Sequence, residues 1–177
     1  MRPAERRERF TAIYEANYHR ILGYALRRVS REEADDVVAE TFLVAWRRLD
    51  EVPDGDGARL WLYGTARRVL ANQERSRRRR VRLAERARHD VVPLGEEIAG
   101  SSTADAFSRL RHADRELLAL VAWEGLGAAE IARVYGCSAN AVRIRLHRAR
   151  RRLRREFARP AQEAEQAVVA VVREEAS

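Results

Sequence analysis

Residues 125–154, GLGAAEIARVYGCSANAVRIRLHRARRRLR, are the part of the chain best suited to bind a nucleic acid. In AAEIARVY the apolar residues recur at helical spacing, Gly136 then interrupts the pattern, and Ser138 can cap a second helix from about Ala139 to Arg154. The second helix has an apolar side made of Ala141, Val142, Leu146, Ala149 and Leu153. Its other side is rich in arginine, and the major groove of DNA admits such a helix. The segment predicts a helix-turn-helix that reads DNA; an ordinary helical hairpin with a solvated basic face is the alternative.

A second group of basic residues follows Trp61, in a segment that also contains Tyr63. Arginines interleaved with aromatic side chains suit single-stranded nucleic acid, because guanidinium groups hold phosphates while bases stack or enter pockets. Trp61 is better explained as a core residue. The candidates that share one helical face are Arg68, Asn72, Arg75 and Arg79.

A third candidate surface lies on the segment 31–50, where acidic residues flank large apolar ones. Such a pattern can dock a protein with a basic rim and an apolar centre. The simpler reading is that Phe42 and Trp46 belong to the core, and we expect both to do so in part. Asp35 and Asp36 are adjacent on the predicted helix, so their carboxylates diverge and do not form a two-carboxylate catalytic site.

The elements that must position these surfaces are all helical. An amphipathic pattern runs from Phe10 to Val29, and Ser30 with Glu33 forms a capping box for a helix that starts at Arg31. PDGDG at 53–57 predicts a turn, after which Asp56 can cap a helix from about Ala58. Two further helices are expected, one from Ser102 or Thr103 and one over 113–124. The sequence shows no strand-like alternation.

A change in composition divides the chain. Residues 89–105, HDVVPLGEEIAGSSTAD, contain no arginine and separate two arginine-rich blocks. We therefore expect an all-α protein with two small helical domains joined by a flexible acidic linker. The expected boundaries are 1–88, a linker at 89–106, 107–159, and a C-terminal tail at 160–177. After Pro160 the sequence could form a short helix with a patch of valines, and a frayed tail and a docking segment explain this stretch equally well.

Composition narrows the classes of function. The net charge of +8 and the sequence pI of about 10.7 favour a polyanionic partner. All the basic residues are arginine, and the single cysteine, Cys137, excludes an internal disulfide. The histidines are scattered and there is no phosphate loop, so we expect a binding protein rather than an enzyme, with no cofactor and no metal. No apolar run is long enough for a membrane span, and the start of the chain is charged, so we expect a cytoplasmic protein.

Three segments in this order resemble the extracytoplasmic-function (ECF) sigma factors: DDVVAETFLVAWRRLD (35–50), WLYGTARRVLANQERSRRRR (61–80) and the helix-turn-helix at 125–153. The resemblance covers about residues 10–155. It implies a specificity subunit of bacterial RNA polymerase with two helical domains, a region 2-like one and a region 4-like one. It also implies that the acidic linker follows polymerase channels built for nucleic acid.

The resemblance assigns roles to the three surfaces. The first segment would dock core RNA polymerase on the clamp helices of the largest catalytic subunit, through Asp35, Asp36, Glu40, Thr41, Phe42 and Trp46. The second would melt and read the minus-ten promoter element through Arg67, Arg68, Asn72, Arg75 and Arg79, with a flipped base near Arg68 and Asn72. The third would read the minus-thirty-five element through Ser138, Asn140, Arg143, Ile144, His147, Arg148 and Arg151. The polymerase flap and an anti-sigma factor are further implied partners, and no membrane insertion is expected.

This chain departs from the family pattern at three positions. Arg68 stands where the family often has asparagine, which bears on the base selected at minus ten. Gly127 replaces the usual serine cap of the helix that follows. Ile144 occupies a place where a small polar residue is usual, and it could contact a thymine methyl group.

Two other functions fit part of the sequence. A stand-alone helix-turn-helix regulator explains 125–154 but gives no role to 31–50, and a homodimer on a palindromic site would favour it. An RNA-binding or antitermination protein would use the two arginine blocks, and RNA binding without polymerase would favour that.

Overall fold

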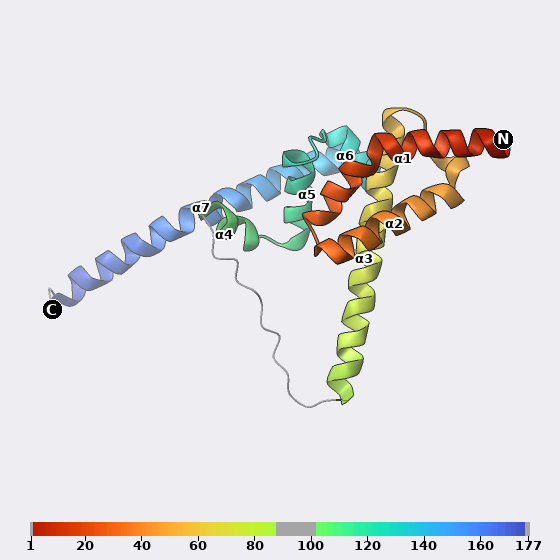
Figure 1. The fold of residues 1–177 in the computed structure, drawn as a ribbon. Helices are drawn as coiled ribbons and strands as arrows, with labels where there is room; N and C mark the ends of the chain where they lie inside the picture. The colour runs from red at the N-terminus through yellow and green to blue at the C-terminus, as the bar shows by residue number, and fades with distance from the viewer. Residues whose placement is uncertain (1, 88–101, 176–177) are drawn as a thin grey trace. The chain divides into compact units, whose positions relative to one another are not determined.

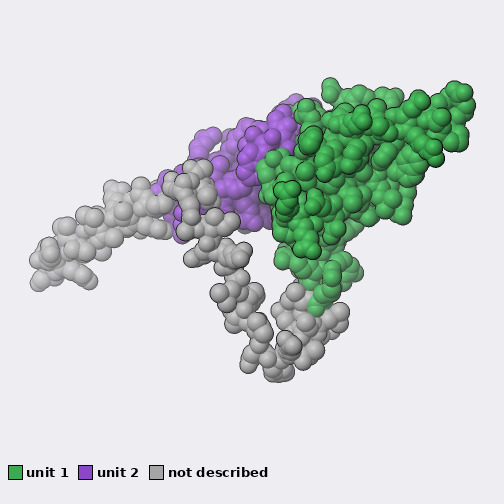
Figure 2. Space-filling model, in the orientation of Figure 1, with its two compact units in different colours: residues 1–94, 130–137 green, residues 95–129, 138–177 purple. Residues whose placement is uncertain are grey.

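The computed structural model describes residues 2–87 and 102–175, with side chains described for 2–80 and 105–159. These parts of the chain contain helices and no strand, as the sequence predicts (Figure 1). The chain divides into two compact units, one of residues 1–94 and 130–137 and one of residues 95–129 and 138–177 (Figure 2). No helix within the described ranges is long and apolar enough to cross a membrane.

Unit 1 is built on three long helices that pack against one another: α1 (Pro3–Leu26), α2 (Arg31–Arg47) and α3 (Asp56–Ala87). The predicted capping box starts α2, since the Glu33 amide donates to Ser30 Oγ over 3.4 Å and the Ser30 amide donates to Glu33 Oε2 over 3.2 Å. Helix α3 starts two residues before the predicted Ala58. The buried side chains between the helices include Ile21, Tyr24, Val37, Leu62, Tyr63 and Ala66.

Two arginines of α1 hold the connection between α2 and α3. After α2 the chain forms the short helix η1 (Leu49–Glu51). Arg9 donates to the carbonyl oxygens of Leu49 and Val52 over 3.0 and 2.6 Å, and Arg6 donates to that of Trp46 over 2.6 Å. These carbonyls lie in the last turn of α2 and just beyond it, and that of Leu49 also accepts from the Val52 amide over 3.2 Å. The first turns of α1 therefore fix the route from α2 into α3.

Unit 2 contains α4 (Ser102–Ser108), α5 (His112–Ala122) and α7 (Ala139–Glu175), and both α4 and α5 pack on α7. Its core includes Leu117, Leu118, Leu120, Val142, Leu146 and Ala149. The prediction that the recognition helix ends near Arg154 was wrong, because α7 continues through Pro160 to Glu175. The residues after Pro160 are rich in Ala, Gln and Glu, which are good helix formers and continue the helix beyond the proline. The predicted linker 89–106 lies outside the described residues, except for its last part, which forms the start of α4.

The turn of the helix-turn-helix has the predicted chemistry. Helix α6 (Ala128–Tyr135) ends at Gly136, whose φ is +65°. The Cys137 amide donates to the Ala132 carbonyl over 3.0 Å, as in a helix C-cap with a left-handed glycine. Ser138 Oγ then accepts from the Ala141 amide over 3.2 Å and caps α7.

We predict that Gly136→Ala destabilises the chain by about 1–2 kcal/mol, because a Cβ at positive φ meets the following carbonyl oxygen. Urea unfolding followed by circular dichroism measures the change. Gly23→Ala in α1 is the matched control: an added Cβ there meets only the end of the Arg27 side chain, at 3.2 Å, and the helix gains about 0.5–1 kcal/mol. Equal midpoints for the two variants would contradict the role of Gly136.

Candidate nucleic-acid and protein interfaces

Helix α7 separates its apolar and polar sides as the sequence predicts. Val142, Leu146 and Ala149 are buried. All the residues predicted to face the minus-thirty-five element are exposed: Ser138, Asn140, Arg143, Ile144, His147, Arg148 and Arg151. Ile144 is 45% exposed, which is unusual for a large apolar side chain and leaves it free to contact a methyl group. The exposed face can therefore supply guanidinium donors, an amide, an imidazole and one apolar contact to DNA.

An ion pair inside unit 2 joins α7 to α5. Arg152 Nη1 donates to both carboxylate oxygens of Asp114, over 3.0 and 2.7 Å, and the Asp114 side chain is only 11% exposed. Asp114 belongs to the first turn of α5, where the helix dipole also favours a negative charge. Arg152 follows the three buried apolar residues along α7, so the ion pair adds a polar contact to the apolar packing between α5 and α7. Sequence reasoning did not find it, since the partners lie 38 residues apart.

We predict that Asp114→Asn lowers the stability of unit 2 by about 1–3 kcal/mol, because the amide cannot balance the Arg152 charge and Asp114 is almost buried. The near-ultraviolet signal of Trp123 during urea unfolding, recorded with Trp46 and Trp61 replaced by Phe, reports this unit. Asp105→Asn on α4 controls for the loss of a carboxylate in the same unit. An unchanged unfolding midpoint for Asp114→Asn would show that the pair contributes nothing.

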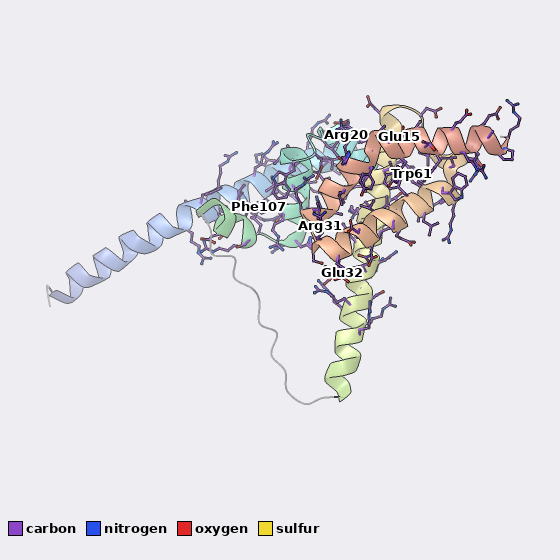
Figure 3. The ribbon with its side chains drawn as sticks, viewed as in Figure 1. Glu15, Arg20, Arg31, Glu32, Trp61 and Phe107 are labelled. Atoms are coloured by element: carbon purple, nitrogen blue, oxygen red, sulfur yellow. The ribbon has the colours of Figure 1, made fainter. Side chains whose placement is uncertain are left out.

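The predicted minus-ten residues occupy the middle of α3. Arg68, Asn72, Arg75 and Arg79 are exposed, and their side-chain hydrogen bonds are local: Arg68 donates to Thr65 Oγ1 over 3.2 Å, Arg75 to Asn72 and Arg79 to Ser76. None of these contacts is an ion pair. Trp61, labelled in Figure 3, is half-buried near the start of α3, as its predicted core role requires.

One carboxylate lies among these arginines. Glu74 accepts from Arg78 and from Arg77, and these contacts lower the pKa of Glu74 below its ordinary value, with the Arg78 hydrogen bond as the largest cause. Glu74 therefore stays ionised and pairs with Arg77 and Arg78. The positive charge of α3 that is not paired with Glu74 includes Arg68, Arg75 and Arg79, which lie on the face predicted to contact the minus-ten element.

Arg67 is held within unit 1, unlike the other predicted minus-ten residues. Its guanidinium lies over the ring of Tyr135, 4.1 Å from the centroid, and it is half-buried. About two turns earlier on α3, Arg59 donates to Glu130 over 2.7 Å. A Cβ at Gly64 would lie 3.3 Å from the Val134 carbonyl oxygen, so the two backbones approach closely there.

The residues of α2 predicted to dock polymerase differ in their exposure to solvent. Asp35, Asp36 and Glu40 are exposed. Thr41 is fully buried and donates to the Val37 carbonyl over 2.7 Å, and Phe42 is 4% exposed. These two residues can support a docking surface but cannot form it as the chain is folded here. Trp46 is half-buried, in agreement with a partial core role.

Sequence reasoning missed Leu43, which is 41% exposed. It follows Asp36 by seven residues and Glu40 by three, so the three residues share a face of α2. That spacing could have identified it. Leu43 is therefore the exposed large apolar side chain beside the acidic residues, whereas Phe42 is buried.

The described residues contain no group of three His, Cys, Asp or Glu side chains that could hold a metal ion.

Comparison with known proteins identifies the family. A model of sigma-70 region 2 matches residues 13–80, and a model of sigma-70 region 4 matches residues 103–153. The ECF RNA polymerase sigma factor SigL of Mycobacterium tuberculosis is 30% identical over 151 residues, covering 81% of this chain and 85% of SigL. BldN of Streptomyces coelicolor, also an ECF sigma factor, is 31% identical over 154 residues, covering 81% of this chain and 55% of BldN.

Solved structures agree with this result. CnrH in complex with the cytosolic domain of CnrY has a TM-score of 0.54 and 29% identity, and the match covers 81% of this chain and 84% of CnrH. The sigma factor RpoE of Bartonella quintana, in complex with the anti-sigma factor NepR, shares the fold with a TM-score of 0.64 at 24% identity, over 84% of this chain and 96% of that one. The chain thus belongs to the ECF sigma factors, non-catalytic proteins that direct transcription initiation by RNA polymerase.

Proposed function

We propose that this sigma factor divides promoter recognition between α3 and α7 while α2 docks core RNA polymerase. The observation that carries the proposal is the exposed face of α7, where every predicted DNA-facing residue lies opposite a buried apolar stripe. Arginine contacts with phosphates would supply affinity and register, and a few base contacts would supply specificity. The region 2-like and region 4-like parts are proposed to correspond to residues 1–88 and 107–159.

The minus-thirty-five element is read by α7, with Asn140, Arg143 and His147 toward bases or phosphates. The minus-ten element is melted and read by α3, with a flipped base near Arg68 and Asn72. Each surface alone binds weakly. When polymerase holds both surfaces, DNA that is bound to one of them meets the other at a high effective concentration. The binding free energies of the two weak contacts then add.

Core polymerase docks on the exposed acidic face of α2. Asp35, Asp36 and Glu40 meet a basic rim of the clamp helices, and Leu43 and Trp46 supply apolar contact. The proposal keeps Thr41 and Phe42 as supports beneath that face. The flap of polymerase is the proposed partner of the region 4-like part.

An anti-sigma factor is the proposed inhibitor. The relative CnrH is found in complex with the cytosolic domain of CnrY, which supports a protein partner of this kind. The stacking of Arg67 on Tyr135 supports a free state in which part of the minus-ten surface is occupied. Binding of polymerase and promoter would then have to separate these two side chains.

Run-off transcription on sheared genomic DNA of the source bacterium tests the proposal, with core polymerase in the presence and absence of the protein. We expect new start sites that share a pair of short upstream elements. If a folded, partner-free protein gives no new starts, the sigma activity is contradicted for that polymerase. A palindromic operator bound by a homodimer would instead favour a stand-alone regulator.

A further inference from the structure

The second half of α3 is surrounded by arginines. Five of the six residues 75–80 are arginine. No described side chain of α3 after Val69 is buried, and this part of the helix extends away from α1 and α2 (Figure 1). Because an α-helix turns by about 100° per residue, arginines so close together point in nearly all directions around its axis. A phosphate backbone would therefore meet a guanidinium group from whichever side it approached, if nothing balanced these charges.

One side of this segment is the face predicted to read the minus-ten element, and we call it the promoter face (Arg68, Asn72, Arg75 and Arg79). Measured around the helix axis from Arg68, Arg75 and Arg79 lie within about 20° of the same line. The three arginines donate to uncharged acceptors, which are the Thr65 hydroxyl, the Asn72 amide oxygen and the Ser76 hydroxyl. An uncharged acceptor does not balance the charge of a guanidinium group, so the promoter face keeps its attraction for phosphate.

Arg77 and Arg78 lie outside the promoter face and share one carboxylate. Around the same axis, Arg77 lies about 180° and Arg78 about 80° from Arg68, and Glu74 lies between them. Arg77 Nε donates to Glu74 Oε2 over 3.0 Å, and Arg78 Nε donates to Glu74 Oε1 over 2.5 Å. Both oxygens of the carboxylate are thus engaged by arginines that do not belong to the promoter face.

The Glu74 carboxylate acts on these two arginines as a phosphate would. Its negative charge offsets one of the two positive charges, and its oxygens occupy a donor of each guanidinium group. The same hydrogen bonds, with that from Arg78 as the largest cause, lower the pKa of Glu74, so the carboxylate is charged at neutral pH. A phosphate that approached Arg77 or Arg78 would have to replace Glu74 or lie beside its like charge.

We propose that Glu74 determines specificity by keeping Arg77 and Arg78 from DNA phosphates, so that α3 offers one side to strand-separated DNA. Random DNA loses the contacts that it could make in other orientations around the helix, whereas promoter DNA on the promoter face loses none. Glu74 therefore raises the ratio of promoter binding to random binding. The inference rests on the proposed function in taking α3 as the surface that binds the minus-ten element.

The first probe is a dye-labelled single strand of random sequence, because α3 is the surface proposed for separated strands. Fluorescence anisotropy measures its binding to the full chain over a range of salt concentrations. Glu74→Gln keeps the shape and helix propensity of the side chain but removes its charge, and we expect about threefold tighter binding in 0.15 M salt. The slope of log affinity against log salt should steepen by about 0.7 for each arginine that gains a phosphate.

Matched variants separate the pairing from net charge. Glu8→Gln makes the same change of charge at an exposed position of α1 and should change affinity less than twofold. Arg77→Ala should weaken binding less than twofold in the wild type but about threefold in the Glu74→Gln background, because only there is Arg77 available to phosphate. Far-ultraviolet circular dichroism verifies that each variant folds.

The second probe measures specificity with reconstituted holoenzyme. It is a fork of duplex DNA with a single-stranded minus-ten region, carrying either a promoter from the run-off experiment or a scrambled sequence. Glu74→Gln should raise affinity for the scrambled fork about threefold and for the promoter fork less than twofold, since a strand on the promoter face does not reach Arg77.

Two results would overturn the proposal. Equal gains in Glu74→Gln and Glu8→Gln, with the same effect of Arg77→Ala in both backgrounds, would mean that only net charge acts. An equal gain on promoter and scrambled forks would mean that Glu74 lowers affinity without affecting specificity. Failure of the proposed function is measured separately: if Arg75→Ala and Arg79→Ala together leave promoter binding unchanged, α3 does not read the minus-ten element, whatever Glu74 does.

Discussion

Asp36→Arg should weaken the binding of this sigma factor to core RNA polymerase by about tenfold or more in 0.15 M salt, because like charges placed opposite each other at an interface cost several kcal/mol. Asp36 is exposed, forms no ion pair with the described side chains, and lies one turn before Glu40 on the face that ends at Leu43. Arginine is a good helix former, so the variant should fold. Competition against a labelled sigma factor for a fixed amount of core measures the affinity.

The matched control is Glu8→Arg, which makes the same change of charge at an exposed position of α1. It should leave the affinity within about twofold, since an exposed charge outside the interface acts only through screened, long-range attraction. The loss in Asp36→Arg should grow when Glu40→Arg is added. A folded Asp36→Arg variant that binds core as wild type does would contradict the assignment of α2.

Leu43→Ala tests the apolar part of the same surface. Because Leu43 is already 41% exposed, its truncation should cost the fold less than about 1 kcal/mol while weakening core binding about five- to tenfold. Thermal unfolding and core competition, measured on the same sample, separate the two effects. A loss of stability without a loss of affinity would place Leu43 in the fold alone.

The sequence predicts the elements of this protein well where their signals are local. The capping box of Ser30 and Glu33, the left-handed Gly136 and the Ser138 cap each depend on residues within one turn, and each has the predicted geometry. The burial of Val142 and Leu146 follows from the 3.6-residue period in the same way. These features depend on short-range sterics and hydrogen bonds, which tertiary packing does not reverse here.

Features that depend on distant parts of the chain could not be predicted in the same way. The helical spacing predicts that Phe42 and Trp46 lie toward one side of α2. It does not predict how much of that side α1 covers, and Thr41 and Phe42, which the resemblance places at the polymerase interface, are buried. The contacts of Arg67 with Tyr135 and of Asp114 with Arg152 join residues far apart in the sequence. Sequence spacing alone carries no information on such pairs. The predicted end of the recognition helix near Arg154 was wrong because the residues that follow Pro160 are good helix formers, and α7 continues to Glu175.

The second large expected effect is a loss of transcription when the proposed contact of α7 with the minus-thirty-five element is removed. Arg148→Ala should reduce transcription about tenfold from promoters with an intact minus-thirty-five element, since a good bidentate contact between arginine and guanine contributes about 1–3 kcal/mol. On templates in which that element is scrambled, the variant and the wild type should differ less than twofold, because the wild type then has no base contact to lose. Single-round transcription with matched templates measures both. Arg145→Ala, an exposed arginine of α7 outside the predicted DNA-facing set, is the control.

The salt dependence of the same variant distinguishes a base contact from a phosphate contact. If Arg148 binds a phosphate, its removal lowers the slope of log affinity against log salt by about one and weakens all sequences alike. If it binds a guanine, the slope changes little and the discrimination at one base pair disappears. An equal loss of transcription on intact and scrambled templates, with an unchanged slope, would exclude both contacts and move the reading of the element to Asn140, Arg143 and His147.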